Sequence, residues 1–234
     1  MELFTKLFLA HLLVDFMLQP KKWVLDKEVN KVKSKYLYVH VVLHFLVTLI
    51  LLWDFNYWKI ALIIMITHYI IDLLKLYVGP KFKHKNLPFF IDQILHILVV
   101  YCIAYYGDLA NHTIALFQNI DVLFVTAFVF ISYPTAILIS KLLSGMSKHI
   151  ETDHESLPNA GMYIGIIERF FVFAFILLGR WEVIGFLIAA KSVFRFNDLK
   201  ESNSRELTEY ILIGTLLSFG IAILAGLAYL NFRM

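Results

Sequence analysis

The apolar residues of this chain lie in long continuous blocks separated by short polar segments, and this pattern decides the fold class. Hydrophobic residues make up 60% of the sequence, against about 45–50% in soluble domains. Polar and apolar residues do not alternate within the blocks, which excludes an outer-membrane barrel. Since a helix needs about 20 apolar residues to cross a membrane, we expect an all-α, polytopic helical membrane protein with about eight transmembrane helices.

The blocks also predict where these helices lie and how the chain is divided. We expect four spans in a domain formed by residues 1–106 and four more in a C-terminal domain formed by residues 107–234. The seventh block is the shortest in apolar length, because Lys191 and Arg195 lie near its end. The predicted spans cover residues 2–19, 36–53, 57–78, 89–106, 121–143, 161–179, 181–196 and 207–230.

The distribution of Lys and Arg between the loops predicts the orientation in the membrane. Cations occur in segments 20–35, 79–88, 144–160 and 197–206, whereas segments 54–56 and 107–120 have none. Loops rich in Lys and Arg face the cytoplasm. We therefore expect a multi-pass protein of the bacterial cytoplasmic membrane with both termini outside.

The first four predicted spans each carry two ionisable residues that are four positions apart. Residues at this spacing share one helical face and lie about 6 Å apart along the axis. Ionisable side chains inside a bilayer are costly and indicate function. The pairs are His11 and Asp15, His40 and His44, His68 and Asp72, and Asp92 and His96.

The depths of these pairs agree from span to span. The order of shallow and deep residue reverses whenever the predicted helix direction reverses, so the eight residues form two levels in the cytoplasmic half of the membrane. The deeper level holds His11, His44, His68 and His96, and the shallower level holds Asp15, His40, Asp72 and Asp92.

The residue types at these two levels favour a metal centre. Five imidazoles and three carboxylates suit zinc, iron or manganese better than Cu(I) or an iron–sulfur cluster. Facing helices of a bundle often build sites for two metals. We expect one or two divalent ions, with zinc favoured, and some of the eight residues supporting a ligand instead of binding metal. A hydrogen-bonded network that only joins the helices and bis-His haem ligation are the alternatives.

The second half carries charged residues at Glu168, Arg169, Lys191 and Arg195. One interpretation is internal ion pairing, such as Glu168 with Lys191 or Arg195. The other is that Arg169, Lys191 and Arg195 bind an anionic headgroup, because Arg and Lys recognise phosphate and carboxylate. Glu168 would then orient one of these cations or act in proton transfer. Lys75 lies on nearly the same face as His68 and is a further candidate for binding an anionic substrate, or it extends to lipid headgroups.

The segments HLLVDFMLQP, HYIID and IDQILH resemble a bacterial family of multi-spanning inner-membrane proteins of unknown function. Its signature is H-x-x-x-D-F-x-L-Q near the N-terminus. The segments GIIER, KSVFRF and EYILIGTLLSF are similar to the longer members of that family. The resemblance implies a prokaryotic cytoplasmic-membrane protein and brings no activity. The His- and Asp-rich spans are also similar in kind to inner-membrane metal-dependent hydrolases, by analogy alone.

These observations predict a membrane-embedded metal-dependent hydrolase that acts on an amphiphilic ester or phosphoester. Asp15, Asp72 or Asp92 would be the general base, and membrane lipids and an anionic amphiphile are the expected partners. No nucleic-acid partner is predicted, and the oligomeric state stays open. A di-iron oxidoreductase acting on acyl chains is one alternative. A transporter of divalent metal or protons is another, although no matching polar set is expected in the outer half of the first four spans.

Overall fold

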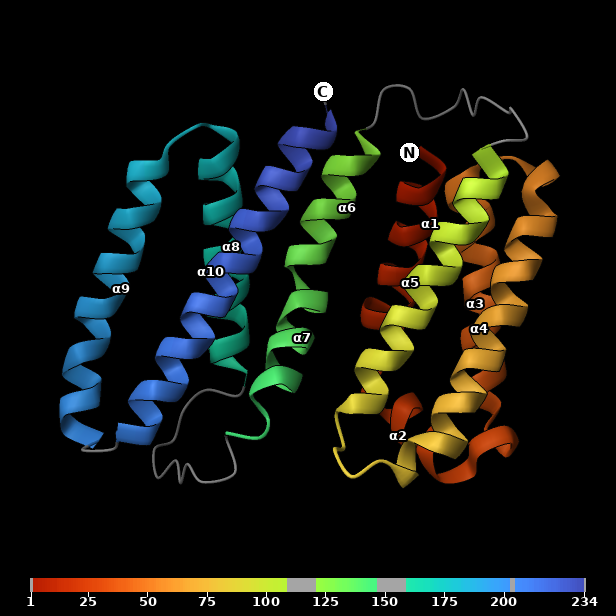
Figure 1. Ribbon diagram of the computed structural model, residues 1–234, viewed down its shortest axis with the longest axis horizontal. Helices are drawn as coiled ribbons and strands as arrows, with labels where there is room; N and C mark the ends of the chain where they lie inside the picture. The colour runs from red at the N-terminus through yellow and green to blue at the C-terminus, as the bar shows by residue number, and fades with distance from the viewer. Residues whose placement is uncertain (1, 109–120, 147–158, 203–204, 234) are drawn as a thin grey trace. The chain divides into compact units, whose positions relative to one another are not determined.

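The computed structural model describes residues 2–108, 121–146, 159–202 and 205–233, and every regular element in these ranges is helical (Figure 1). The all-α fold is therefore confirmed. The elements are α1 (Glu2–Leu12), the π-helical turn η1 (Leu13–Met17), α2 (Lys21–Asn30), α3 (Lys35–Leu52), α4 (Trp58–Val78), α5 (Leu87–Asp108), α6 (Val122–Ile131), α7 (Tyr133–Leu143), α8 (Ala160–Leu177), α9 (Trp181–Ser202) and α10 (Arg205–Arg233).

The number of helices that can cross a membrane is lower than the eight expected. Among the described residues, six helical segments are long and apolar enough, and a seventh is added if α1 and α2 count as one bent span. The predicted seventh span forms α9 but does not pass this test. Its charges at Glu182, Lys191 and Arg195 interrupt the apolar sequence.

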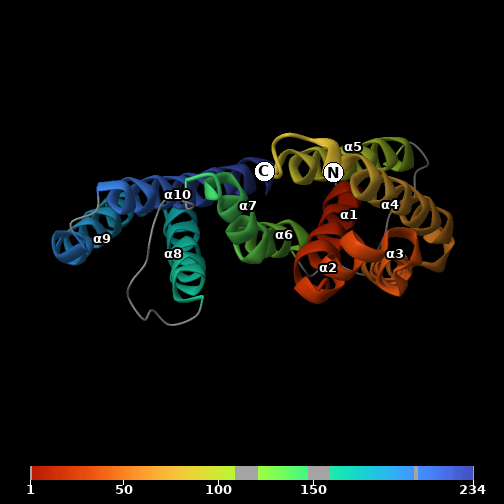
Figure 2. The ribbon, with the colours of Figure 1, turned by 90° about the horizontal axis from the view of Figure 1, so that it is seen from below.

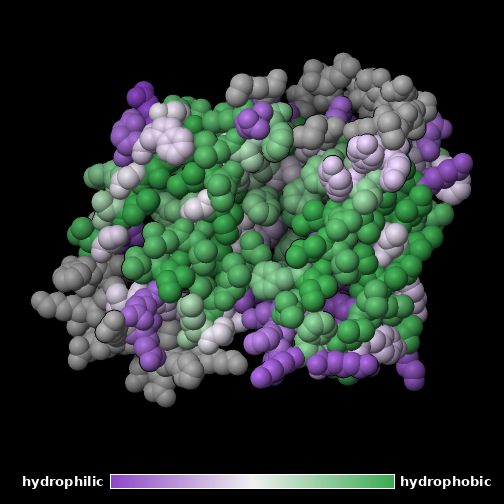
Figure 3. Space-filling view, in the orientation of Figure 1, coloured by the Kyte–Doolittle hydropathy of each residue, from purple (hydrophilic) through white to green (hydrophobic). Residues whose placement is uncertain are grey.

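The exposed surface of these helices is apolar, as a lipid-facing surface should be. α4, for example, exposes Ile63, Ile66, Ile70 and Leu74 at the three- to four-residue spacing of one helical face. Figure 3 shows hydrophobic side chains along the middle of the helices and hydrophilic ones near their ends. The chain is therefore a helical membrane protein.

The described chain divides into two compact units, Met1–Thr126 and Ala127–Met234. In the first unit, α1 packs against α3 and α5, and α4 also packs against both of these helices. Figure 2 views this bundle from the end at which α2 lies. The core away from that end is apolar and includes Leu3, Leu7, Leu52, Ile64 and Val100.

The chain turns sharply between α1 and α2. The segment Glu2–Met17 and the segment Lys21–Lys33 meet at 84°. The turn begins in η1, where the amide of Leu18 donates to the carbonyl of Leu13 over 2.9 Å in the wider π pattern. Pro20 then precedes the first residue of α2 with an extended backbone, ψ 147°, so the two helical segments are not continuous.

In the second unit, α8 packs against α7, α9 and α10. Gly226 permits the close contact between α10 and α8, because a Cβ at this position would lie 2.8 Å from the side chain of Ile176. α6 and α7 are separated by a break at Ser132, whose ψ of −116° is not helical. Pro134 follows at the start of α7 and has no amide hydrogen to continue the helix.

Candidate metal centre

The four helices of the first unit bring all eight predicted residues together near the end of the bundle where α2 lies. We call them the His/Asp cluster. Their rings and carboxylates are buried, and the most exposed of them, the side chain of Asp15, is 10% exposed. The members come from α1 (His11), η1 (Asp15), α3 (His40 and His44), α4 (His68 and Asp72) and α5 (Asp92 and His96).

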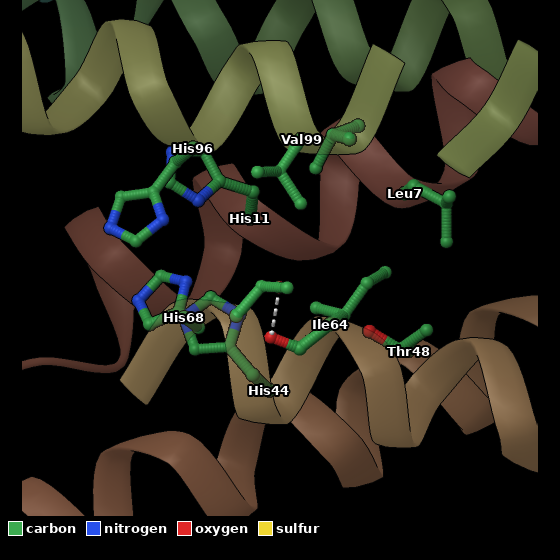
Figure 4. A pocket seen from close by; sticks show the side chains of 10 residues that line it. Leu7, His11, His44, Thr48, Ile64, His68, His96 and Val99 are labelled. Carbon is green, nitrogen blue, oxygen red and sulfur yellow. Dashed lines mark hydrogen bonds between the residues drawn. The ribbon is translucent and has the colours of Figure 1, made fainter. Parts of the chain in front are cut away.

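The imidazoles of three helices are stacked against one another. The ring centroids of His44 and His68 are 3.6 Å apart, and those of His68 and His96 are 3.8 Å apart. The His11 ring lies 5.3 Å from that of His96. Figure 4 shows these four rings pointing toward one another from their separate helices. The deeper level predicted from the sequence is therefore a contiguous group of rings.

Asp15 lies at the centre of the ring nitrogens. Its Oδ1 atom is 2.8 Å from Nε2 of His44 and 3.4 Å from Nε2 of His68. The same oxygen is 3.5 Å from Nε2 of His40 and 3.8 Å from Nδ1 of His11. One carboxylate oxygen has two lone pairs and cannot accept hydrogen bonds from four imidazoles at once. A cation among these atoms would satisfy them together.

Several atoms of the His/Asp cluster are buried without any hydrogen bond among the described residues. They include Nε2 of His96 and Oδ1 of Asp92, which lie 3.4 Å apart. Nδ1 of His40 is a third such atom. Buried polar groups in native proteins almost always have a partner, so the long contact between His96 and Asp92 leaves both atoms able to bind a cation.

The spacing of one group of residues fits a tetrahedral ion. The potential ligand atoms of His11, Asp15, His44 and His68 all lie within 4.8 Å of one another. Ligands about 2.0–2.1 Å from a tetrahedral zinc ion lie about 3.3 Å from one another. The distances of 2.8, 3.4 and 3.8 Å from Asp15 to the three rings are centred on this value.

Two further groups share residues with the first. Asp15, Asp92 and His96 form one of them, and His40, His68 and Asp72 form the other. Asp15 has two oxygens and can therefore serve two ions. His68 uses the same Nε2 toward Asp15 and toward His40, 3.1 Å away, so the first group and the His40 group compete for it. The arrangement allows two ions joined by Asp15.

Two lysines hold the outer oxygens of the acidic residues. Nζ of Lys27, from α2, is 2.8 Å from Oδ2 of Asp72, and Nζ of Lys75 is 2.7 Å from Oδ2 of Asp92. Oδ1 of each carboxylate is then directed inward, 3.9 Å and 3.4 Å from Nε2 of His96. The predicted substrate residue Lys75 is thus engaged with Asp92, while its side chain is still 34% exposed.

The sequence interpretation missed two members of the site. Gln93 donates to Asp15 and to Asp92, and its Oε1 is 3.2 Å from Nε2 of His11. Its position next to Asp92 on the same helix could have suggested it. Lys27 was counted only as a loop cation, and no local pattern shows that α2 turns back and buries it.

A narrow pocket continues from the rings into the bundle (Figure 4). It is lined by His11, His44, Thr48, Ile64 and His96, among others. The hydroxyl of Thr48 is buried and has no hydrogen-bond partner among the described residues. Lys6, also buried, is paired with Glu2 over 2.6 Å. The half of the bundle beyond the rings therefore holds more polar groups than the sequence led us to expect.

The charged residues of the second unit lie in a different kind of environment. Glu168 pairs with Lys191, as the first of the two interpretations held. Arg169 is 2% exposed, and its guanidinium donates to the carbonyls of Ile131 and Ser132 over 2.5 and 3.1 Å. It also donates to the hydroxyl of Ser218 over 2.9 Å.

These contacts correct the expectation that Arg169 presents its charge to a substrate. Its donors bind the carbonyls of Ile131 and Ser132 at the break between α6 and α7. The carbonyl of Phe130, which the missing amide hydrogen of Pro134 would otherwise serve, accepts from the hydroxyl of Thr135 over 2.7 Å. The side chain of Arg195 lies outside the described residues, so its predicted role stays a prediction.

A helical membrane protein with a buried group of imidazoles and carboxylates is thus the class that fold and site define. Residues 3–142 match the model of a family described as Protein of unknown function (DUF3307), and the chain belongs to this family. The matched range contains the whole His/Asp cluster. No curated protein and no solved structure matches the chain. The chemistry must therefore be argued from the site itself.

Proposed function

We propose that the His/Asp cluster binds two divalent metal ions and uses them to hydrolyse an ester or phosphoester at the membrane surface. The observation that carries this proposal is the convergence of ring nitrogens from three helices on Oδ1 of Asp15 at the spacing of a tetrahedral ion. Zinc is favoured because the group offers nitrogen and carboxylate oxygen, and iron or manganese would accept the same donors.

The ligands would be divided between the two ions in the following way. His11, His44, His68 and Asp15 hold the first. Asp15, Asp92 and His96 hold the second, which explains why Nε2 of His96 and Oδ1 of Asp92 are buried without a hydrogen bond. Two ions placed in this way stabilise both the attacking and the leaving oxygen of a displacement at phosphorus or carbon.

Asp72 is the best candidate for the general base. It belongs to neither of these two ligand groups. In its own candidate group, His68 is already assigned to the first ion, which leaves His40, whose Nε2 lies 3.8 Å from Oδ2 of Asp72. A carboxylate beside a metal-activated water accepts the water's proton. Lys27 holds Oδ2 of Asp72, so Oδ1 is the oxygen that would accept this proton.

The substrate would enter where Lys75 is exposed. The side chain of Lys75 is 34% exposed, whereas the members of the His/Asp cluster are buried or nearly so. An ammonium group at this position attracts an anionic headgroup, while the apolar surfaces of the helices accommodate an acyl or prenyl tail. We infer that the substrate is an amphiphile reached from the leaflet beside α2.

The same proposal includes a location. The Lys-rich segments 20–35 and 79–88 flank the end of the bundle that holds the cluster, so the positive-inside rule assigns this end to the cytoplasm. Both termini of the chain would then face the outside of a bacterial cytoplasmic membrane. Reporter fusions at each terminus test this orientation, and a cytoplasmic N-terminus would overturn it.

Elemental analysis of the purified protein tests the metal centre. We expect about two equivalents of metal per chain in the wild type and a clear loss in His44→Ala, which removes a ligand of the first ion. Hydrolysis of a chromogenic phosphodiester should depend on the same metal. Full metal content in His44→Ala would remove this residue from the ligand set, and iron with an oxygen-dependent optical change would favour an oxidoreductase.

A further inference from the structure

α2 has one face turned toward the bundle and one face turned away from it. Lys27 is the buried residue of this helix, and its charge reaches Asp72. The ring of Trp23 stacks on that of Tyr36 with centroids 5.3 Å apart, and Asp26 accepts a hydrogen bond from Ser34. These contacts fix α2 across the end of α3 and place Lys27 at the edge of the His/Asp cluster.

The outward face combines exposed apolar side chains with exposed cations. Leu25 is 52% exposed and Val29 is 78% exposed. Around them lie the exposed lysines at positions 21, 22, 33 and 35, with Glu28 as the exposed acid within α2. Apolar side chains interleaved with lysines are typical of a helix that lies in the headgroup region of a membrane with anionic lipids.

The direction of α2 agrees with this placement. It meets the preceding segment at 84°, so if α1 crosses the bilayer with its neighbours, α2 runs along the surface. In this position Leu25 and Val29 can enter the headgroup layer while the lysines contact phosphate groups. A nucleic acid would leave the exposed apolar residues beside these cations without a partner, and the 84° turn favours a membrane surface over a soluble acidic protein.

We propose that the outward face of α2 binds anionic phospholipid and that this contact holds Lys27 on Asp72, so that the membrane surface controls the metal centre. The control of the metal centre by the membrane surface rests on the proposed function. Lys27 binds Oδ2 of Asp72 and thereby directs Oδ1 toward His96. When α2 is released from the surface, this orientation is lost and the centre binds metal more weakly.

The lipid contact can be measured on the full-length chain in nanodiscs. A fluorophore is attached to Val29→Cys in a Cys102→Ser background, and quenching by aqueous iodide is compared between phosphatidylcholine alone and its mixture with phosphatidylglycerol. We expect the anionic lipid to protect the fluorophore. Replacing Lys21, Lys22, Lys33 and Lys35 by Gln should abolish the protection, and equal quenching in both lipids would overturn the proposal.

The link to the metal centre is measured as zinc affinity in the same two nanodiscs, with empty nanodiscs subtracted. We expect tighter binding with the anionic lipid. Lys27→Met should remove this lipid dependence and weaken zinc binding on the order of tenfold, as loss of a group that orients a ligand does. Lys59→Met, which changes an exposed lysine near the first residue of α4, outside the lipid-binding face, is the control and should keep tight binding and its lipid dependence.

The two proposals fail in different ways. A wild type that binds no zinc in either lipid would sink the metal centre, and the iodide measurement would still decide whether α2 binds anionic lipid. Zinc binding of equal strength in both lipids would overturn the control by the membrane surface while leaving the metal centre intact.

Discussion

Both units of this protein bury ionisable side chains between helices, but they treat them in opposite ways. In the second unit, Arg169 donates to two carbonyls and a hydroxyl, and Glu168 is paired with Lys191. In the first unit, ring nitrogens of His11, His44 and His68 crowd around one oxygen of Asp15.

The difference separates a structural role from a binding role. A buried charge whose donors are all directed at protein oxygens stabilises the fold and has little to offer a ligand. A buried set of donors that outnumber the acceptors within reach needs something else to complete it. Composition alone does not make this distinction, because burying ionisable side chains in a membrane costs free energy in both units.

The largest effect is expected for Asp15→Asn, which tests the binding role directly. The carboxylate belongs to both proposed ligand groups, so its loss should remove most of the bound metal from both positions. Metal per chain, measured by elemental analysis, should fall to a small fraction of the wild-type value. Arg169→Met is the matched control and should keep the wild-type ratio in the protein that folds. Retention of both ions in Asp15→Asn would contradict the assignment of Asp15 as a bridge.

Lys75→Met tests the orienting role of the lysines within the same site. The ammonium of Lys75 holds Oδ2 of Asp92 and leaves Oδ1 facing His96. Its removal should weaken binding of the second ion about 10- to 100-fold, the usual effect of losing a group that supports a ligand. Zinc titration should then resolve one tight and one weak equivalent. Two tight equivalents would show that Asp92 needs no such support.

Arg169→Met tests the structural role. It leaves the buried carbonyl of Ile131 without its donor, whereas the carbonyl of Ser132 still accepts from the amide of Ala136 over 3.3 Å. Because one unsatisfied buried group costs about 1–3 kcal/mol, we expect the free energy of unfolding in detergent to fall by about that amount, with metal content unchanged. Arg169→Lys keeps the charge but not the fork of donors and should recover only part of the loss. Wild-type stability in Arg169→Met would contradict this assignment.

Gly165→Ala tests the same structural role of Arg169 with a smaller expected effect. A Cβ at Gly165 would lie 3.2 Å from Nη1 of Arg169, so the guanidinium must shift away from Ser218. We expect a loss of about 1 kcal/mol in the free energy of unfolding. Gly161→Ala, one turn earlier and with nothing within 4 Å, should instead stabilise α8 by up to about 1 kcal/mol. Equal effects at the two glycines would show that Arg169 is free to move.

The smallest effect is expected for Thr48→Val. The hydroxyl faces the pocket beside His44 and has no hydrogen-bond partner among the described residues. Replacing an unpaired buried hydroxyl by a methyl group should leave stability unchanged or raise it by about 1 kcal/mol. A clear destabilisation, measured by the same unfolding assay, would mean that a bound water bridges Thr48 to the rings and that the pocket belongs to the site.

Much of the first unit can be predicted from the sequence, because its main signals are periodic. The spacing of four between members of each pair and the reversal of their order place His44, His68 and His96 at one depth, and the structure stacks their rings. The all-α fold follows from the apolar blocks. The number of spans was overestimated where charges divide α9.

Other features depend on contacts that no local pattern encodes. Lys27 reaches Asp72 across 45 positions of the sequence, and Arg169 caps a helix break 37 and 38 positions before it. Pro134 lies inside the span predicted at residues 121–143, and no local pattern shows which distant side chain donates to the carbonyls at the break beside it. The hydrogen-bond partners of such side chains can be assigned only when the packing of the helices is known.

The π-helical turn at Leu13–Met17 lets the first segment hold one more residue than a regular α-helical turn would. Deleting Val14 would therefore let this turn close as an α-helix, with little change in the direction of the chain beyond it. A deletion between Leu7 and His11 in the regular helix α1 would instead rotate His11 by about 100° relative to Leu3 and Leu7, which pack in the core. The first segment thus tolerates a change in length at its turn and not along α1.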